Sequence, residues 1–298
     1  MRFAGEFAAL GTAVCWAAGS NFFAAAGQRM GSVVLNRLRI TVAAVLLCTA
    51  LLILRGSPWP VWATSWQVGL LALSGLIGFV FGDTYYFRSL IILGPGRAAL
   101  ITSSAPVFTL LFAWPLLGEH PGPLVLLGVA LTLGGISWVI WEREHKVHEH
   151  VEGSMFVGVV AGVLAAVGQA GGYVLSKLAL RTDLDPLSAT VIRIVAATAG
   201  VWLLAALQRD VRRSLGALRD RRGSAFMVGG AFFGPFLGVT LSLTALKYIE
   251  AGVAASITAV YPVLTLLLSS RFHGERLTLR TLAGALVAAA GVVVLFLR

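Results

Sequence analysis

Long apolar runs limit what this chain can fold into more than any other feature of its sequence. A helix needs about 20 mostly apolar residues to cross the hydrocarbon core of a bilayer, and ten runs approach this length. Only 12% of the 298 residues are charged, compared with about 25% in soluble domains. We therefore predict an all-α integral membrane protein with ten transmembrane helices, at Phe3–Ala26, Val33–Leu54, Val68–Leu90, Arg97–Leu117, Leu124–Trp141, Ser154–Lys177, Pro186–Leu207, Ala225–Lys247, Gly252–Phe272 and Thr278–Leu297.

The formal net charge of +10 does not indicate a nucleic acid partner, because the basic residues lie mostly in short connections between the apolar runs. They are denser in the odd-numbered connections, and by the positive-inside rule this places both termini outside the cytoplasm. Arg2 and the run that follows it imitate a signal peptide. Since Glu6 interrupts that run, we expect an uncleaved first span.

Sliding the sequence against itself shows an internal repeat at an offset of 156 residues. Pro106 and the pair Gly118-Glu119 fall on Pro262 and Gly274-Glu275. Each half holds five predicted spans, and an odd number of crossings inserts the second copy in the opposite orientation, which makes the repeat inverted. We assign residues 1–141 to the first five-helix repeat, 142–153 to a polar linker and 154–298 to the second repeat.

Two matching stretches carry a resemblance to a known family. GPGRAALITSSAPVFTLLFAWPLLGEHPGPLVLLGVALTLGG and EAGVAASITAVYPVLTLLLSSRFHGERLTLRTLAGALVAAAG resemble the two repeats of EamA-type proteins in the drug/metabolite transporter superfamily. The resemblance implies a ten-helix secondary carrier, often an exporter of amino acids or small metabolites. The sequence departs from the family pattern where Pro121-Gly122-Pro123 replaces a hydroxyl-bearing helix start, and at Asp83, which is not a usual family position.

Charged residues inside predicted spans are functional candidates, because a charge at the centre of a transmembrane helix costs about 2.5 to 3.5 kcal/mol or more. Asp83 lies inside the third span, and the repeat aligns it with Val239. Arg88 is five residues further along, about 140° around a helix, so we expect it to reach the interface instead of pairing with Asp83.

Two arginines are candidate partners of Asp83. Arg39 and Arg193 occupy nearly equivalent positions in the second and seventh spans. Arg193 is the better internal charge, whereas Arg39 has a slightly favoured alternative place beside Arg37 at the membrane interface. An Asp83 to arginine pair that only locks helices together is the competing interpretation of these charges.

We predict a solute site between the halves, near the bilayer midplane. Asp83 would bind a cationic group or a proton and Arg193 an anionic group, which suits a zwitterion such as an amino acid. Proline removes a helical hydrogen bond, so kinks are expected at Pro106 and Pro262, with the freed carbonyls available to solute. The further binding candidates are Arg39, Gln169, Asn21, Tyr86, Tyr173, Trp16 and Tyr261.

The leading hypothesis is a secondary transporter that moves a small organic solute by alternating access, with export as the expected direction. No cofactor is expected, and no GxxxxGK[ST] loop is present to bind ATP, so energy would come from a gradient through proton or exchange coupling. We therefore expect a multi-pass protein that resides in the cell membrane and is surrounded by lipid. A non-transporting membrane subunit or receptor and a membrane-embedded enzyme acting on lipid intermediates are the alternatives.

The linker EREHKVHEHVEG contains three histidines, His145, His148 and His150. Histidine is a common metal ligand. Because these residues alternate with glutamates and basic residues in a connection between spans, we interpret the segment as a solvated linker and predict no metal site.

Overall fold

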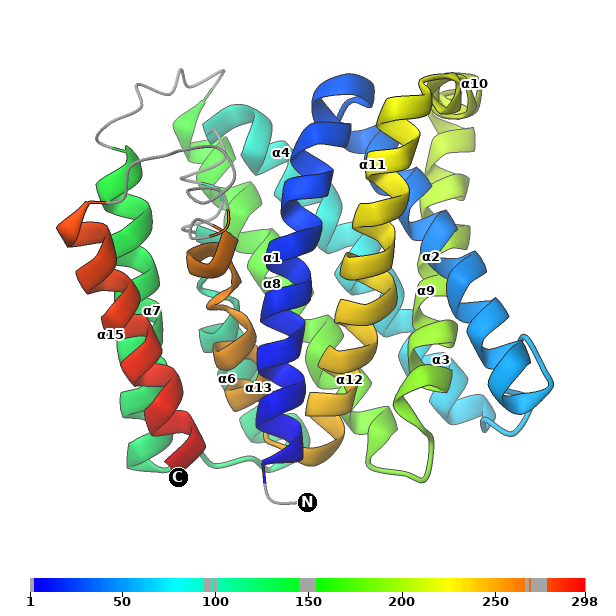
Figure 1. Ribbon diagram of the computed structural model, residues 1–298. Coiled ribbons are helices and arrows are strands. Elements are labelled where there is room, and N and C mark those ends of the chain that lie inside the picture. Colours follow the sequence, from blue (N-terminus) through cyan, green and yellow to red (C-terminus); the bar gives the residue numbers. More distant parts are fainter. Residues whose placement is uncertain are drawn as a thin grey trace.

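The computed structural model describes residues 3–93, 98, 101–144, 154–265, 268 and 278–297. The secondary structure of these residues is helical and includes no strand, which confirms the predicted all-α class (Figure 1). The long helices run up and down side by side. Their bounds, with two π-helical segments (η1, η3) and one 3-10 turn (η2), are α1 Ala4–Met30, α2 Ser32–Arg55, α3 Ser65–Gly75, η1 Leu76–Gly82, α4 Asp83–Leu93, α6 Ala105–Leu117, α7 Pro123–Glu144, α8 Met155–Leu180, α9 Pro186–Leu207, α10 Val211–Gly216, η2 Ala217–Arg219, α11 Arg221–Ala231, η3 Phe232–Gly238, α12 Val239–Tyr248, α13 Ala251–Thr258 and α15 Leu279–Leu297.

Eight helical stretches among the described residues are long and apolar enough to cross a membrane. Two of them are composite: Ser65–Leu90 spans α3, η1 and α4, and Arg221–Tyr248 spans α11, η3 and α12. The shorter apolar helices Ala105–Leu117 and Ala251–Thr265 occupy the predicted fourth and ninth spans, parts of which lie outside the described residues. The chain is a multi-pass membrane protein, and the number ten stays a prediction.

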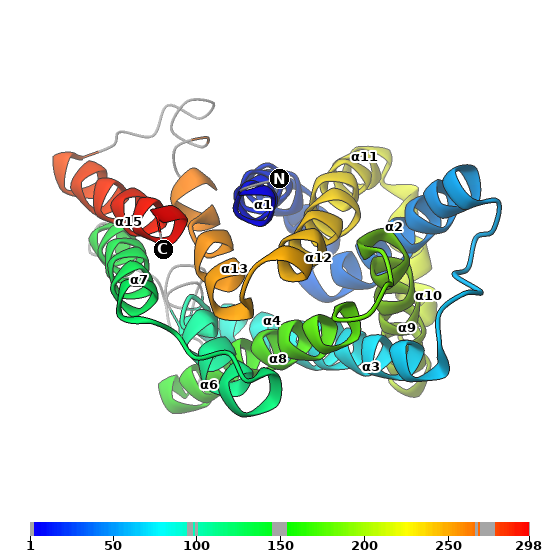
Figure 2. The same ribbon diagram turned by 90° about the horizontal axis from the view of Figure 1, so that it is seen from below.

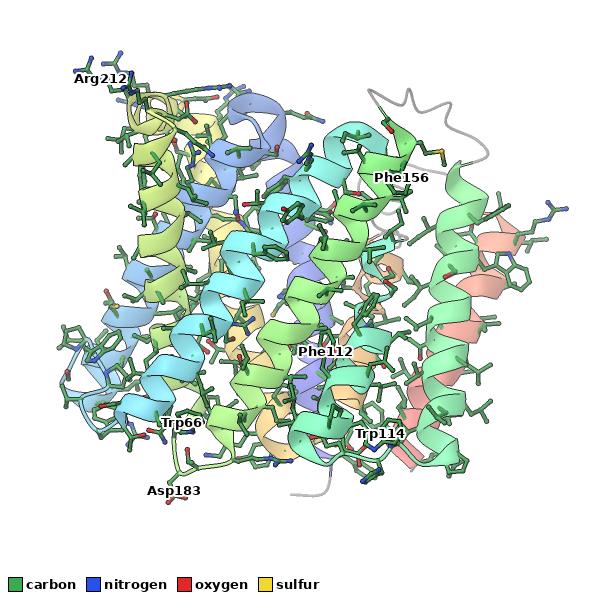
Figure 3. All side chains as sticks on the ribbon, turned by 180° about the vertical axis from the view of Figure 1, so that it is seen from behind. Trp66, Phe112, Trp114, Phe156, Asp183 and Arg212 are labelled. Carbon is green, nitrogen blue, oxygen red and sulfur yellow. The ribbon has the colours of Figure 1, made fainter. Side chains whose placement is uncertain are left out.

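The outer surface is apolar along its height and polar at its ends, as a lipid environment requires. Figure 3 shows Trp66 and Trp114 near one end of the bundle and Phe156 near the other, all pointing outward. Their exposed fractions are 65%, 58% and 76%, and aromatic rings at these levels are typical of the two interfaces of a bilayer. Asp183 and Arg212 mark the two polar ends (Figure 3).

Local sequence chemistry sets several helix ends. The hydroxyl of Thr64 accepts a hydrogen bond from the N–H of Gln67 at 3.3 Å, and the Gln67 side chain accepts one from the N–H of Thr64 at 2.7 Å, so the two begin α3 with a capping box. Asp185 caps α9 in front of Pro186. Gly118 ends α6 with φ 65°, which glycine adopts without steric cost.

The composite spans repeat each other element by element. Each begins as an α-helix, changes to a seven-residue π-helix and returns to an α-helix. The π-helical segments, Leu76–Gly82 and Phe232–Gly238, start and end 156 residues apart. π-Helical turns are rare and often lie at functional sites, so the middle of both composite spans is a candidate functional region.

Helices of one half pack mainly on helices of the other. The first helix, α1, contacts α11, η3 and α12, and its counterpart α8 contacts α3, η1 and α4. The helix α2 packs on α9, and α6 on α13. Figure 2, viewed along the bundle, shows α8 beside α3 and α4, and α8 also contacts α12 and α13 of its own half. The two halves therefore share one interior.

The helices α7 and α15 pair through glycines (Figure 1). A Cβ added at Gly128 would lie 3.1 Å from the carbonyl oxygen of Gly291, and one added at Gly284 would lie 3.2 Å from that of Gly135. In the repeat alignment, Gly128 corresponds to Gly284 and Gly135 to Gly291, so the two contacts are equivalent to each other. This interface is self-complementary, as in a twofold dimer, and the missing side chains let the backbones touch.

The predicted kinks at the two prolines are interruptions in the structure. Turn residues 103–104 and 259–260 separate the helical segments on either side, and Pro106 and Pro262 each occupy the second position of the segment that follows. Having no N–H, proline cannot donate to the carbonyl four residues earlier, which is that of Thr102 or Thr258. Both interruptions face the interior described next.

Candidate functional site

A small cavity lies between the two interrupted spans. Its volume is about 30 Å³, which is room for about two water molecules. Hydroxyl, amide and aromatic side chains all contribute to its lining. The lining residues are Trp16, Thr102, Ser103, Ala105, Pro106, Thr109, Gln169, Tyr173, Ala255, Thr258, Ala259 and Tyr261.

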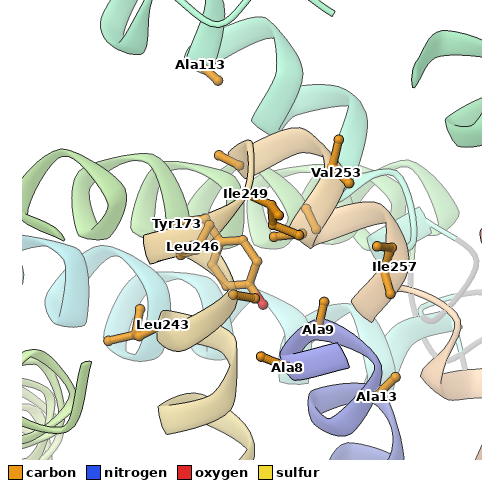
Figure 4. Packing of buried hydrophobic residues seen from close by; sticks show 14 of the residues in the cluster. Ala8, Ala9, Ala13, Ala113, Tyr173, Leu243, Leu246, Ile249, Val253 and Ile257 are labelled. Carbon is orange, nitrogen blue, oxygen red and sulfur yellow. The ribbon is translucent and has the colours of Figure 1, made fainter. Parts of the chain in front are cut away.

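Five of the predicted site residues line this cavity: Trp16, Pro106, Gln169, Tyr173 and Tyr261. The rings of Trp16 and Tyr261 meet edge to face, with centroids 5.6 Å apart and planes at 85°. The Tyr173 hydroxyl accepts a hydrogen bond from Ser242 Oγ at 2.8 Å. Figure 4 shows the Tyr173 ring beside Leu246 in the apolar core, with Ala8 and Ala9 of α1 opposite. The cavity is thus built on tightly packed elements.

The Asp83 carboxylate pairs with Arg39. Arg39 Nη2 lies 2.6 Å from Asp83 Oδ2, and both side chains are about four-fifths buried, with 16% and 22% of their surface exposed. Arg39 Nε donates to Asn36 Oδ1 at 2.8 Å, and its guanidinium lies over the Phe23 ring, 5.0 Å from the centroid. This charge-assisted pair joins α2 to the junction of η1 and α4.

The slightly favoured interfacial position for Arg39 beside Arg37 is therefore wrong. Arg37 turns away to a separate cluster, where it is 4% exposed. Its Nη1 donates to Asp210 Oδ2 at 2.5 Å and to Ser214 Oγ at 3.0 Å, and its Nη2 donates to Gln208 Oε1 at 2.7 Å. Two residues apart on a helix point about 200° apart, which is why the two arginines separate.

Arg193 is the most buried charge of the candidate site. It is 3% exposed, and its Nε has no hydrogen-bond partner among the described residues. The guanidinium lies over the Phe79 ring, 4.8 Å from the centroid, and Nη2 lies 2.8 Å and 2.9 Å from where a Cβ would stand on Gly78 and Gly172. Two glycines and a π-helix thus make room for a cation in the interior.

The two halves differ in how they compensate these arginines. Arg39 has the carboxylate of Asp83, whereas at the equivalent position the second half carries Val239, which is buried. Arg193 interacts electrostatically with Asp83 and with the cavity residue Tyr173, yet it forms no ion pair with a described carboxylate. Leaving one charge of this kind unpaired in the interior is costly.

Besides the charged residues Asp83, Arg39 and Arg193, three further predicted residues do not line the cavity. Asn21 donates its Nδ2 to the carbonyl of Ala17 at 2.9 Å. Tyr86 stacks at an angle on Phe87, 5.6 Å between centroids, and interacts electrostatically with Asp83. Pro262 only positions the lining residue Tyr261. Arg88 is exposed on α4, and its position at the membrane interface stays a prediction.

Sequence reasoning missed the hydroxyl groups of the cavity. Thr102, Ser103, Thr109 and Thr258 all line it. A signal was present, because Thr102 and Thr258 stand four residues before the two prolines and are aligned by the repeat. A hydroxyl next to a carbonyl without its helical partner offers a donor and an acceptor close together.

The end of the bundle near the start of α1 is closed by a polar layer. Lys177 Nζ donates to the carbonyls of Leu246 and Ile249 and lies 3.4 Å from Glu119 Oε1. Glu119 Oε2 accepts a hydrogen bond at 2.8 Å from the N–H of Ala251, the first residue of α13. Glu119 thus caps a helix of the other half, not the helix that follows it in the chain. Its repeat partner Glu275 and the linker histidines His145, His148 and His150 lie outside the described residues.

The fold and the site define a polytopic, all-helical membrane protein with a polar interior between two sets of helices. A model of the EamA-like transporter family matches residues 3–141 and 156–297. The chain belongs to the EamA-like transporter family. A solved structure, described only as the crystal structure of a protein, aligns with a TM-score of 0.78 and 17% sequence identity over 99% of this chain and 96% of that one. No curated protein sequence matches.

Proposed function

We propose that this chain is a secondary transporter that moves a small zwitterionic solute, an amino acid or a related metabolite, by alternating access, in the direction of export. The observation that carries the proposal is Arg193: a fully buried guanidinium, beside a cavity residue, without a carboxylate partner. An anionic group of the solute would supply the missing counter-charge. Membership in a transporter family supports the class of function.

Asp83 supplies the opposite sign. In this state it is neutralised by Arg39 at 2.6 Å. A cationic solute group or a proton that binds Asp83 would replace Arg39, so that the pair opens when the site fills and closes again when it empties. The hydroxyl and amide groups of the cavity, led by Gln169 and Thr258, would hold the uncharged part of the solute.

The volume of about 30 Å³ indicates a closed state, because an amino acid needs a larger cavity. Opening toward the start of α1 requires separation of the layer around Lys177 and Glu119. A structure with this layer broken and the opposite end packed would be the second state of the cycle.

The two-repeat architecture belongs to the same proposal, with residues 1–141 and 154–298 as inverted five-helix repeats. Three observations support it: the π-helices 156 residues apart, the self-complementary pairing of α7 with α15, and the position of the start of α1 and the end of α15 at the same end of the bundle (Figure 1). A gradient, through proton or exchange coupling across the cell membrane, would supply the energy.

Reconstitution tests the function. Liposomes that contain the purified protein are loaded with a mixed pool of amino acids and small metabolites, and the loss of each compound is measured against protein-free vesicles. We expect selective loss of zwitterions from the native protein and loss of this activity in Arg193→Gln and Asp83→Asn. The matched control is Arg88→Gln, which removes an exposed charge from the helix that carries Asp83.

The outcomes separate three interpretations. Selective efflux that both site variants abolish supports the proposal. Efflux that persists in Arg193→Gln and Asp83→Asn would assign these charges to a structural lock. No efflux of any compound, with gradients of both directions and with the folded state verified by a cooperative thermal transition, would contradict transport and favour the membrane subunit.

A further inference from the structure

The connection between α9 and α11 carries a concentration of positive charge at one end of the bundle. Between residues 209 and 222 the chain contains Arg209, Arg212, Arg213, Arg219, Arg221 and Arg222, all exposed. The segment forms the short helix α10 followed by the 3-10 turn η2. Figure 1 shows α10 at the end opposite to the start of α1, and Figure 3 shows the Arg212 side chain projecting outward there.

The turn into this segment uses an arginine where glycine fits better. The N–H groups of Asp210 and Arg209 donate to the carbonyls of Ala205 and Ala206, at 2.9 Å and 3.0 Å. This is the Schellman ending of a helix, whose residue in the left-handed conformation is usually glycine. Here it is Arg209, with φ 56°. Compared with glycine, arginine at this position is conformationally strained but adds a positive charge to the segment.

The two aspartates of the segment, Asp210 and Asp220, form ion pairs with arginines from other helices. Asp210 binds Arg37 of α2 at 2.5 Å, and Asp220 binds Arg29 of α1 at 2.6 Å and 3.1 Å. In the part of the chain that the structure describes, none of the six arginines named above forms an ion pair. Their charge is therefore available to a ligand outside the protein.

The segment is also amphipathic. At 100° per residue, Val211, Leu215 and Leu218 fall within an arc of about 60°, and Leu215 and Leu218 are 52% and 43% exposed. Arg212 and Arg219 both lie next to one edge of this arc. Ser214 faces the protein and is held by Arg37 Nη1 at 3.0 Å. Apolar side chains beside arginines at the end of transmembrane helices suit the boundary between lipid headgroups and acyl chains.

We propose that the α9–α11 connection is a binding surface for anionic phospholipids. The arginines bind headgroup phosphates, and Leu215 and Leu218 enter the adjoining acyl region. The exposed leucines favour a membrane over a soluble anion, which would gain nothing from them. This surface is separate from the candidate solute site and does not depend on the proposed transport.

The test measures lipid-dependent stability of the whole protein. The protein in neutral detergent is titrated with dioleoyl phosphatidylglycerol, dioleoyl phosphatidylcholine or inorganic phosphate, and the unfolding temperature is followed by tryptophan fluorescence. We expect phosphatidylglycerol alone to raise it. Since each surface arginine contributes about fivefold to affinity for an anionic surface, Arg212→Gln/Arg213→Gln/Arg219→Gln should weaken the apparent affinity by about a hundredfold.

Two further variants control for charge and folding. Arg55→Gln/Arg88→Gln/Arg280→Gln removes the same net charge at three other exposed positions and should keep the affinity. Arg209→Gly should keep or raise the unfolding temperature without lipid, because glycine relieves the left-handed turn, and should still lower the affinity about fivefold. An equal effect of phosphatidylcholine or phosphate, an equal loss in the control triple variant, or full affinity in Arg209→Gly would overturn the proposal.

Discussion

At the level of side chains, Asp83 and its aligned residue Val239 are the difference between the halves that bears most on charge. Asp83 neutralises Arg39, whereas Val239 leaves Arg193 without a carboxylate. A buried charge destabilises the fold by its desolvation penalty unless an opposite charge or hydrogen bonds compensate it. The difference between Asp83 and Val239 therefore gives the two arginines of the candidate site different electrostatic environments.

Exchanging the charges of Arg39 and Asp83 tests whether their ion pair only stabilises the fold or also takes part in solute binding. In Arg39→Asp/Asp83→Arg the ion pair can re-form, so we expect the unfolding temperature to return to within a few degrees of the native value, above that of either single variant. Transport should stay at least tenfold lower, because the site would present a cation where the solute needs an anion. Recovery of transport together with stability would assign the pair to helix locking alone.

Asp220 gives a prediction on pH outside the membrane spans. The hydrogen bond from Arg29, followed by that from the backbone N–H of Gly223, lowers the pKa of Asp220 below its ordinary value of 3.8. A lowered pKa in the folded state means that this stabilisation is complete above the ordinary value and is lost as the pH falls through the lower one. Asn at this position keeps the helix cap but removes the charge.

We therefore expect Asp220→Asn to lower the unfolding temperature slightly at pH 7 and to match the native protein near pH 2. Thermal unfolding followed between these values checks this. No difference at pH 7 would mean that Asp220 contributes only its helix cap, and a difference that stays constant down to pH 2 would contradict a contribution from the ion pair.

At the level of elements, glycine placement decides which helices touch. Gly135 of α7 faces the backbone of α15 at Ala288, whereas the neighbouring Gly134 faces open space. Gly135→Val should destabilise the fold by about 1 to 3 kcal/mol through overpacking, and Gly134→Val should leave stability almost unchanged. Chemical unfolding in detergent compares them, and equal effects of the two substitutions would contradict the interface.

Features that depend on local sequence could be predicted, whereas features that depend on the packing of distant helices could not. The helix Pro186–Leu207 was predicted with both ends correct, because apolar length and a Pro at the helix start are local signals. The interruptions before Pro106 and Pro262 were expected only as kinks, since a proline does not reveal how far the helix opens. The Asp83 to Arg39 pair depends on how α2 packs on α4, and the hydroxyl lining of the cavity depends on two spans from different halves; neither is encoded locally.

For the whole molecule, the interleaved packing of the halves has a testable consequence. Because α1 packs on α11 and α8 on α3, each half alone would expose the small-residue faces that normally bury one another. We expect residues 1–147 and 148–298, produced as separate chains, to be degraded or aggregated alone. Produced together with a tag on one chain, they should copurify in about equal amounts. A folded, monomeric single half would contradict the shared interior.

The uneven charge of the repeat also bears on the energies of the conformations that alternating access requires. Two identical inverted halves would give an inward-facing and an outward-facing form of equal free energy, each the image of the other. Under the proposed alternating access, Asp83 opposite Val239 would remove this degeneracy, and the empty protein would favour the form in which Arg39 keeps its ion pair with Asp83. Introducing an acid through Val239→Asp would offer Arg193 the same arrangement and bring the two forms closer in population. In the proposed transport cycle, the more populated form of the empty protein would then depend on the presence of one carboxylate in one half.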